Sequence, residues 1–170
     1  MKEIKILYTS LFLVVGLLLP QAGFAYGVVD QTAQTISQNT VLYTITYKFG
    51  FLNRETYLPI AAVRSTLEQD SGLYGVSYDI LDNGEYFGLG NTTSLVLSKA
   101  EIKDNLYYLP EGKSGEFTLV TLLYLPDGVN VTDLTMKINQ QPLILVKDGE
   151  KRPILIEENE LIGFETSTPS

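Results

Sequence analysis

Most of the chain after residue 40 alternates between apolar and polar side chains. From Val41 to Phe49 the odd positions are apolar or aromatic, and most even positions are polar. Residues 74–80 and 133–138 repeat this alternation. Because successive side chains of a strand point to opposite faces, the pattern predicts half-buried β-strands. Phe117 to Leu125 is largely apolar at both parities, which predicts a strand buried on both faces near the centre of the fold.

Turn sequences separate these runs at close intervals. Asp82-Asn83-Gly84 and Asp148-Gly149 contain the pairs that accept positive φ in tight hairpins. One helix candidate, Ile60–Gln69, follows Pro59 and contains β-branched residues. Many short strands, close turns and at most one short helix predict an all-β fold, either a β-sandwich or a small barrel.

The first 25 residues have the composition of a secretory signal peptide. Two lysines precede an apolar run over residues 6–19, and small residues end the segment. This run is shorter than the roughly 20 apolar residues of a membrane-spanning helix. We therefore expect a signal-peptide helix over residues 1–25, cleaved between Ala25 and Tyr26. The protein would then be exported to the periplasm, the cell surface or the medium, and only an uncleaved signal anchor would hold it to a membrane.

The remaining sequence predicts one domain with two short flanks. Residues 26–39 are rich in Gln, Thr and Ser and are expected to form a polar linker or arm. Residues 40–165 are expected to form the β-sandwich domain, and residues 166–170 a flexible tail. The polar arm lacks the alternating apolar residues with which a donated strand fills a neighbour's groove.

Composition narrows the classes of function. The net charge is −8, and the chain contains no histidine and no cysteine. Scattered basic residues make nucleic acid a poor partner, because phosphate binding needs clustered Lys and Arg. Without His and Cys, the usual nucleophile–base arrangements and zinc or haem ligands are missing. We expect a protein that is not an enzyme and has no cofactor. The alternative is a carboxylate-dependent hydrolase acting on an envelope glycan or peptide.

Two acidic segments offer candidate chemistry. Asp70-Ser71-Gly72 matches the Asp-Ser/Thr-Gly sequence of aspartic proteases. In those proteases a hydrophobic strand precedes the motif, whereas here Glu68 and Gln69 precede it. A turn is therefore the favoured interpretation. Four side chains could converge on calcium, which takes about six to eight oxygens. These are Asp79, Asp82, Asn83 and Glu85. Their spacing does not match an EF-hand, and a hairpin turn is the competing interpretation.

Tyrosine is the enriched residue type with binding potential. Tyr57, Tyr107 and Tyr108 fall near predicted strand ends or loops. Exposed tyrosines offer rigid contact area to proteins or sugar rings. Tyrosine also packs well inside sheets, so a core role is the competing interpretation.

One segment resembles a known class of module. Residues 105–126 read NLYYLPEGKSGEFTLVTLLYLP: an aromatic-rich strand, a Pro/Gly turn and a Phe-Thr-Leu strand, with residues 95–98 fitting the strand before them. This resembles a strand pair in immunoglobulin-like and fibronectin-III-like modules of bacterial secreted or surface proteins. The resemblance covers about residues 40–138 and concerns architecture, since the Cys and Trp of antibody-type domains are absent. It implies an immunoglobulin-like β-sandwich, a class whose members serve as spacers, adhesins and partner-binding modules. Together with the signal peptide and the missing catalytic residue types, it leads us to expect a protein that binds or spaces components of a bacterial cell envelope, with another envelope protein or a glycan as partner.

Overall fold

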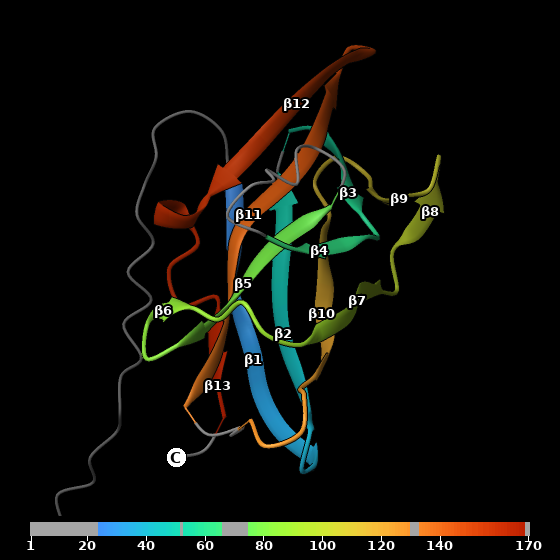
Figure 1. Ribbon diagram of the computed structural model, residues 1–170. Helices are drawn as coiled ribbons and strands as arrows, with labels where there is room; N and C mark the ends of the chain where they lie inside the picture. The colour runs from blue at the N-terminus through green and yellow to red at the C-terminus, as the bar shows by residue number, and fades with distance from the viewer. Residues whose placement is uncertain (1–23, 52, 66–74, 130–132, 169–170) are drawn as a thin grey trace, which may run out of the picture.

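The fold is all-β. The computed structural model describes residues 24–51, 53–65, 75–129 and 133–168 (Figure 1). Within those ranges the regular structure consists of strands β1 to β13 and one 3-10 helix, η1 (Glu158–Glu160). The strands form two sheets whose neighbouring strands are antiparallel, except for one parallel pair. The predicted all-β class is confirmed.

Sheet A has four strands in the order β1-β2-β10-β7. Their bounds are β1 (Phe24–Ser37), β2 (Thr40–Phe51), β10 (Ser114–Tyr124) and β7 (Asn91–Ser98). In β2 the odd residues from Val41 to Phe49 are buried, whereas the even residues are more accessible. The half-buried strand predicted there is confirmed.

Sheet B has nine strands around the long strand β11 (Leu134–Lys147). The first half of β11 pairs with β5 (Val76–Asp82) and the second half with β3 (Glu55–Pro59). Strands β12 (Glu150–Glu157) and β13 (Glu165–Ser167) also pair with β11. Beyond β3 lie β9 (Leu106–Leu109) and β8 (Glu101–Lys103). Strands β4 (Ala62–Arg64) and β6 (Glu85–Tyr86) pair with β5.

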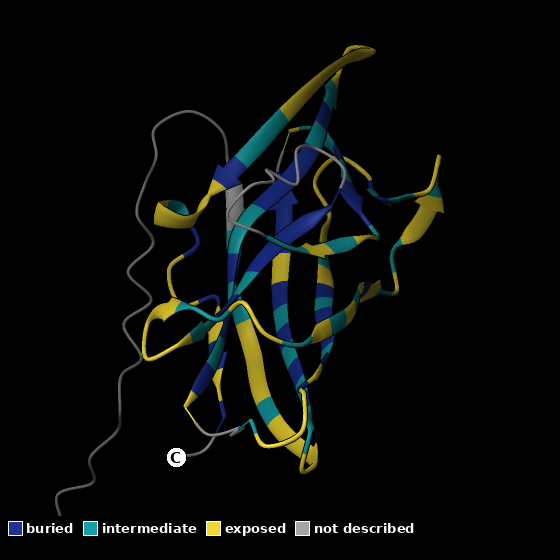
Figure 2. Ribbon diagram, in the orientation of Figure 1, coloured by how far each residue is buried: buried dark blue, intermediate teal, exposed yellow. Residues whose placement is uncertain are grey.

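The core lies between the inner faces of the two sheets (Figure 2). Tyr47 of sheet A is fully buried, and its hydroxyl donates to Gln141 Oε1 of sheet B at 3.0 Å. Its ring lies 6.0 Å from that of Phe117 and 5.6 Å from that of Phe164. Burial of these large rings drives the two layers together, and the buried hydroxyl keeps a partner.

Two predicted hairpin turns are confirmed. Asn83 and Gly84 have φ values of 50° and 84° between β5 and β6. Asp148 and Gly149 have φ values of 53° and 81° between β11 and β12. Two successive positive φ values suit the right-handed twist of a hairpin, and Asn, Asp and Gly tolerate them best.

The expectation of a polar linker over residues 26–39 is wrong. Most of this segment belongs to β1, which pairs with β2 along its length. Tyr26 packs inward, with its ring 5.8 Å from that of Phe49, while most of the later residues are exposed. Two register irregularities in the β1–β2 pair disturb the alternation, so no strand pattern is visible in the sequence.

The expected flexible tail over residues 166–170 is also wrong for its described part. Thr166 lies in β13, and Thr168 donates its backbone N–H to the carbonyl of Leu134 at 2.9 Å. Both threonines are buried. This segment lacks an apolar pattern because β11 holds it mainly through backbone hydrogen bonds.

The helix candidate Ile60–Gln69 is not helical in its described part. Residues 62–64 form β4, parallel to β5, and residues 66–69 lie outside the described ranges. A backbone bond from Val96 N–H to the carbonyl of Ile60, 2.9 Å long, links this segment to β7 of sheet A. Tertiary pairing therefore overrides the local preference.

Strand β10 is buried on one face only. Phe117, Leu119 and Leu123 are buried, whereas Val120 and Leu122 are partly accessible. Neither Val120 nor Leu122 belongs to the set packed on the core. The expectation of burial on both faces is therefore wrong within the described chain. Residues 105–126, the segment with the resemblance to immunoglobulin-like modules, contain the two expected strands, β9 and β10. These strands lie in different sheets and do not pair with each other.

Candidate functional site

Two tyrosines lie side by side on the outer face of sheet B. Tyr57 of β3 and Tyr108 of β9 are direct cross-strand partners. Their ring centroids are 5.1 Å apart and the rings are inclined at 48°. Both side chains are partly accessible, so they present aromatic surface to the solvent. Cross-strand pairs of this kind hold each other in place, which gives the surface a defined shape.

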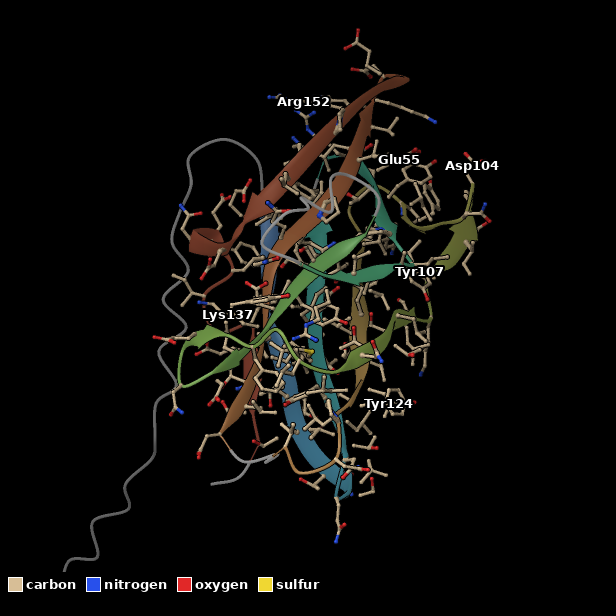
Figure 3. All side chains as sticks on the ribbon, in the orientation of Figure 1. Glu55, Asp104, Tyr107, Tyr124, Lys137 and Arg152 are labelled. Atoms are coloured by element: carbon tan, nitrogen blue, oxygen red, sulfur yellow. The ribbon has the colours of Figure 1, made fainter. Side chains whose placement is uncertain are left out.

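Charged side chains flank Tyr108. Lys103 Nζ of β8 lies 3.4 Å from the centroid of the Tyr108 ring, and Lys103 also pairs with Glu101 at 3.5 Å. Partial burial raises the pKa of Tyr108, and a hydrogen bond to the Glu55 carboxylate raises it further, while Lys103 opposes the shift. Tyr108 is therefore a neutral phenol that donates to Glu55 and carries a cation on its ring. Figure 3 shows Glu55 at the same end of the molecule as Asp104, which follows β8.

A small apolar pit adjoins Tyr57. Its volume is about 20 Å³, and six residues line it: Tyr57, Pro59, Leu106, Pro142, Leu143 and Ile144. A pit of this size holds one water-sized group, such as a methyl group. The outer face of sheet B thus combines two rings, an apolar pit, a carboxylate and an ammonium group.

Tyr107 does not belong to this surface. It is 5 % exposed, its hydroxyl donates to the carbonyl of Val96 at 2.9 Å, and its ring lies 5.6 Å from that of Phe117. Consecutive residues of a strand point to opposite faces, so Tyr107 faces the core while Tyr108 faces outward. This corrects the expectation that Tyr107 offers an exposed contact surface.

The four calcium candidates are divided between two places. Asp82, Asn83 and Glu85 share the β5–β6 turn, where Asn83 Nδ2 donates to Asp82 Oδ1 at 2.8 Å. Asp79 instead accepts hydrogen bonds from Ser65 Oγ and, at 3.0 Å, from Asn139 Nδ2. Among the residues that the structure describes, no group of three or more Asp, Glu, His or Cys side chains is placed to hold a metal ion.

The sequence reasoning missed the polar cluster around Asn139. Asn139 lies in β11 where its pairing with β5 is irregular, and it donates to Ser65 Oγ at 2.7 Å as well as to Asp79. Its buried Oδ1 has no hydrogen-bond partner within the described ranges. The cluster ties the β4 end to β5 and β11. Only the tertiary pairing brings these three residues together, and their spacing in sequence carries no signal.

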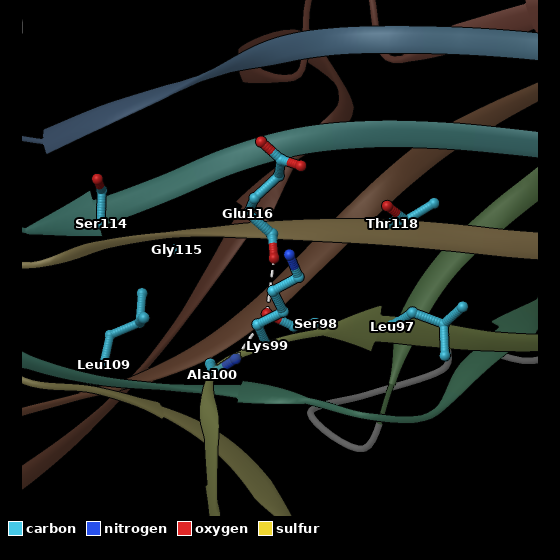
Figure 4. Close-up of a pocket in the computed structure, with 9 residues that line it drawn as sticks. All are labelled: Leu97, Ser98, Lys99, Ala100, Leu109, Ser114, Gly115, Glu116 and Thr118. Carbon is cyan, nitrogen blue, oxygen red and sulfur yellow. Dashed lines mark hydrogen bonds between the residues drawn. The ribbon is translucent and has the colours of Figure 1, made fainter.

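A groove opens where β10 extends beyond the end of β7 (Figure 4). Its volume is about 610 Å³, and its lining includes Leu97, Leu109, Lys99 and Glu116. The pairing of β10 with β7 ends at Phe117 and Ser98. Beyond it, Ser98 Oγ donates to the carbonyl of Glu116 at 2.6 Å. The groove mixes apolar walls with one cation and one anion, and sequence reasoning did not anticipate it.

The predicted signal peptide and protease motif lie largely outside the described residues. These include residues 1–23 and the whole of Asp70-Ser71-Gly72. Ala25 and Tyr26 belong to the first residues of β1, and the Tyr26 hydroxyl donates to the carbonyl of Glu160. A cut before Tyr26 would leave this anchored tyrosine as the first residue. Across the described part of the chain, no helix is long and apolar enough to cross a membrane.

No protein-family model matches the chain, and no curated protein matches it.

Proposed function

We propose that this protein is an exported, non-enzymatic module of the bacterial cell envelope, with an immunoglobulin-like β-sandwich fold. It binds another envelope component through the outer face of sheet B. The observation that carries the proposal is the outward Tyr57–Tyr108 pair, with ring centroids 5.1 Å apart.

The chemistry of this surface suits binding rather than solvation. Tyrosine offers a large amphipathic contact and loses little conformational entropy when it is bound. Here the cross-strand pairing and the Lys103 ammonium already restrict the two rings. A surface that is ordered before the partner arrives pays a smaller entropic cost on binding.

The partner is another envelope protein or a glycan. Ring faces stack on the apolar faces of sugars or on apolar side chains, and Glu55 and Lys103 supply hydrogen-bonding groups next to them. The pit beside Tyr57 accepts a methyl-sized group. Glu55 and Glu101 near the rings disfavour nucleic acid, whose phosphates need clustered cations.

An affinity capture from cell-envelope extract tests this function. The bait is the protein expressed from the full chain, and the test variant is Tyr57→Ala/Tyr108→Ala. Leu89→Ala is the control, because Leu89 is 52 % exposed between β6 and β7 and lies outside both sheets. We expect one specific component with the wild type and the control, and at least about a 10-fold loss with the double variant.

Two outcomes contradict the proposal. The first is capture that does not change in the Tyr57→Ala/Tyr108→Ala protein. The second is turnover of an envelope polysaccharide or peptide by the purified protein, which would favour the carboxylate-dependent hydrolase. Intact mass of the mature protein tests its export, since cleavage before Tyr26 removes residues 1–25.

A further inference from the structure

The outer face of sheet A consists of the outward side chains of β1, β2, β10 and β7, and it carries a continuous apolar patch. Register pairs align Leu42 of β2 with Leu122 of β10, and Val120 of β10 with Leu95 of β7. Leu97 lies two residues beyond Leu95 on the same side of β7 and is 50 % exposed, while Leu95 is 40 % exposed. An apolar patch at the centre of an open sheet face is a mark of an interaction surface.

Four threonines of this face satisfy one another in two pairs. Thr32 and Thr44 share a hydrogen bond of 2.7 Å between their Oγ1 atoms, and Thr46 and Thr118 share one of 2.9 Å. Each pair bridges two neighbouring strands. Burying a hydroxyl that keeps a partner costs far less than burying one that loses its water. These four hydroxyls can therefore be covered at low cost.

Charge is absent from most of the face, although the chain carries a net charge of −8. Residues 31–47, which include half of β1 and most of β2, contain no charged residue. The face carries three charges near one margin: Lys48 lies opposite Glu116, and Asp30 lies opposite Thr46. Two acidic copies repel each other, and this face of low charge is where they approach with little repulsion.

The sequence of β10 also indicates that its outward face packs against another surface. Its outward residues Val120 and Leu122 are as apolar as those of a strand enclosed on both sides. Yet neither is packed against the core in the described chain, and β10 mainly contacts its sheet neighbours β2 and β7.

We propose that a second copy of this chain covers the outer face of sheet A, so that two A sheets stack face to face about a two-fold axis. Sheets pack in this way about 10 Å apart, and a two-fold axis needs a self-complementary surface. Four strands with about eight residues each span about 19 by 27 Å, or about 500 Å² per copy. Two such faces bury about 1,000 Å², the lower end of specific interfaces.

This interface is independent of the proposed binding function, since Tyr57 and Tyr108 lie on sheet B. Analytical ultracentrifugation of the protein tests it, over about 1 to 200 µM, because association depends on concentration. We expect the wild type to shift from one to two copies within this range.

The test variant is Leu95→Glu/Leu97→Glu, which buries four added carboxylates in the paired faces. We expect it to stay monomeric, with association at least about 10-fold weaker. The matched control, Ile102→Glu/Ile162→Glu, changes two apolar residues that are 57 % and 74 % exposed and lie outside sheet A. It should associate like the wild type. Circular dichroism checks that both variants are folded.

If the glutamate variant fails to fold, Leu122→Thr replaces it, since threonine keeps strand propensity while removing apolar area. It should weaken association by at least about 5-fold. A wild type that stays monomeric throughout, or a control that dissociates as fully as the test variant, overturns the proposal. So does a monomer that floats with phosphatidylglycerol vesicles through Leu95 and Leu97, since lipid would then be the cover.

Discussion

The outer faces of the two sheets differ sharply in chemistry, although both sheets bury an apolar inner face. The outer face of sheet A has few charges and combines leucine and valine with two threonine pairs. The outer face of sheet B carries Tyr57 and Tyr108 beside Glu55 and Lys103. The core constrains inward positions, whereas outward positions are free to suit what lies outside. The two faces are therefore expected to meet different partners.

Strand β9 shows the same contrast within two consecutive residues. Tyr107 is enclosed by Val96 and Phe117, while Tyr108 lies among Tyr57, Glu55 and Lys103. Tyrosine thus packs in the core on one side of the strand and forms part of the accessible surface on the other.

The largest expected effect separates these two tyrosines. Tyr107→Ala should lower the free energy of unfolding by about 3–5 kcal/mol, because it removes a buried ring and leaves a cavity. Tyr108→Ala should change it far less while weakening capture of the envelope partner. Urea denaturation measures both variants. Equal losses of stability would show that the outer face of sheet B is a packing surface.

A smaller effect comes from the tyrosines inside the protein at alkaline pH. Burial raises the pKa of Tyr47, and it raises that of Tyr43 against the opposing charge of Arg64. A pKa raised in the folded state contributes stability that is complete below the unfolded value of 10.0 and is lost as the pH rises above it. Stability should fall above about pH 10, by up to about 1.4 kcal/mol per pH unit for each such group.

Tyr47→Phe isolates this alkaline effect. It should cost about 1 kcal/mol at neutral pH, because Gln141 loses its hydrogen-bond donor, and it should make the decline above pH 10 shallower. Urea denaturation at several pH values gives the slope. An unchanged slope would show that Tyr47 does not resist ionisation in the folded protein.

The smallest effect concerns the outer face of sheet A. Thr46→Val and Thr118→Val should each change the free energy of unfolding by less than about 1 kcal/mol, with a coupling of about 0.5 kcal/mol between them. A double-mutant cycle in urea, at concentrations where the protein is monomeric, measures this coupling. No coupling would mean that water, and not the neighbouring threonine, satisfies these hydroxyls. Covering the face would then cost more than we infer.

Several strands could be predicted because their signals are local. The alternation from Val41 to Phe49 reports directly which side of β2 is buried. Asn83-Gly84 and Asp148-Gly149 mark hairpin turns through their own φ preferences. Strand β1 was missed because edge pairing with two irregularities leaves little apolar periodicity.

The candidate sites were less predictable than the strands. Tyr57 and Tyr108 were among the tyrosines singled out, but Glu55 and Lys103 were not, since strands β3, β9 and β8 come together only through sheet pairing. The same holds for the calcium candidates: Asp79 accepts hydrogen bonds from Ser65 and Asn139, whereas Asp82 belongs to the β5–β6 turn. Proximity between distant segments leaves no trace in local spacing.

The sequence by itself determined an all-β chain, the inward side of its central strands and the position of its turns. Side-chain periodicity and backbone preference act over a few residues, so a single sequence carries them. Only the tertiary structure decided that β9 and β10 belong to different sheets, that Tyr107 faces the core while Tyr108 does not, and that one side of β10 is not packed on the core of the described residues. Those outcomes depend on pairing between residues far apart in the chain, whose free energy no local pattern records.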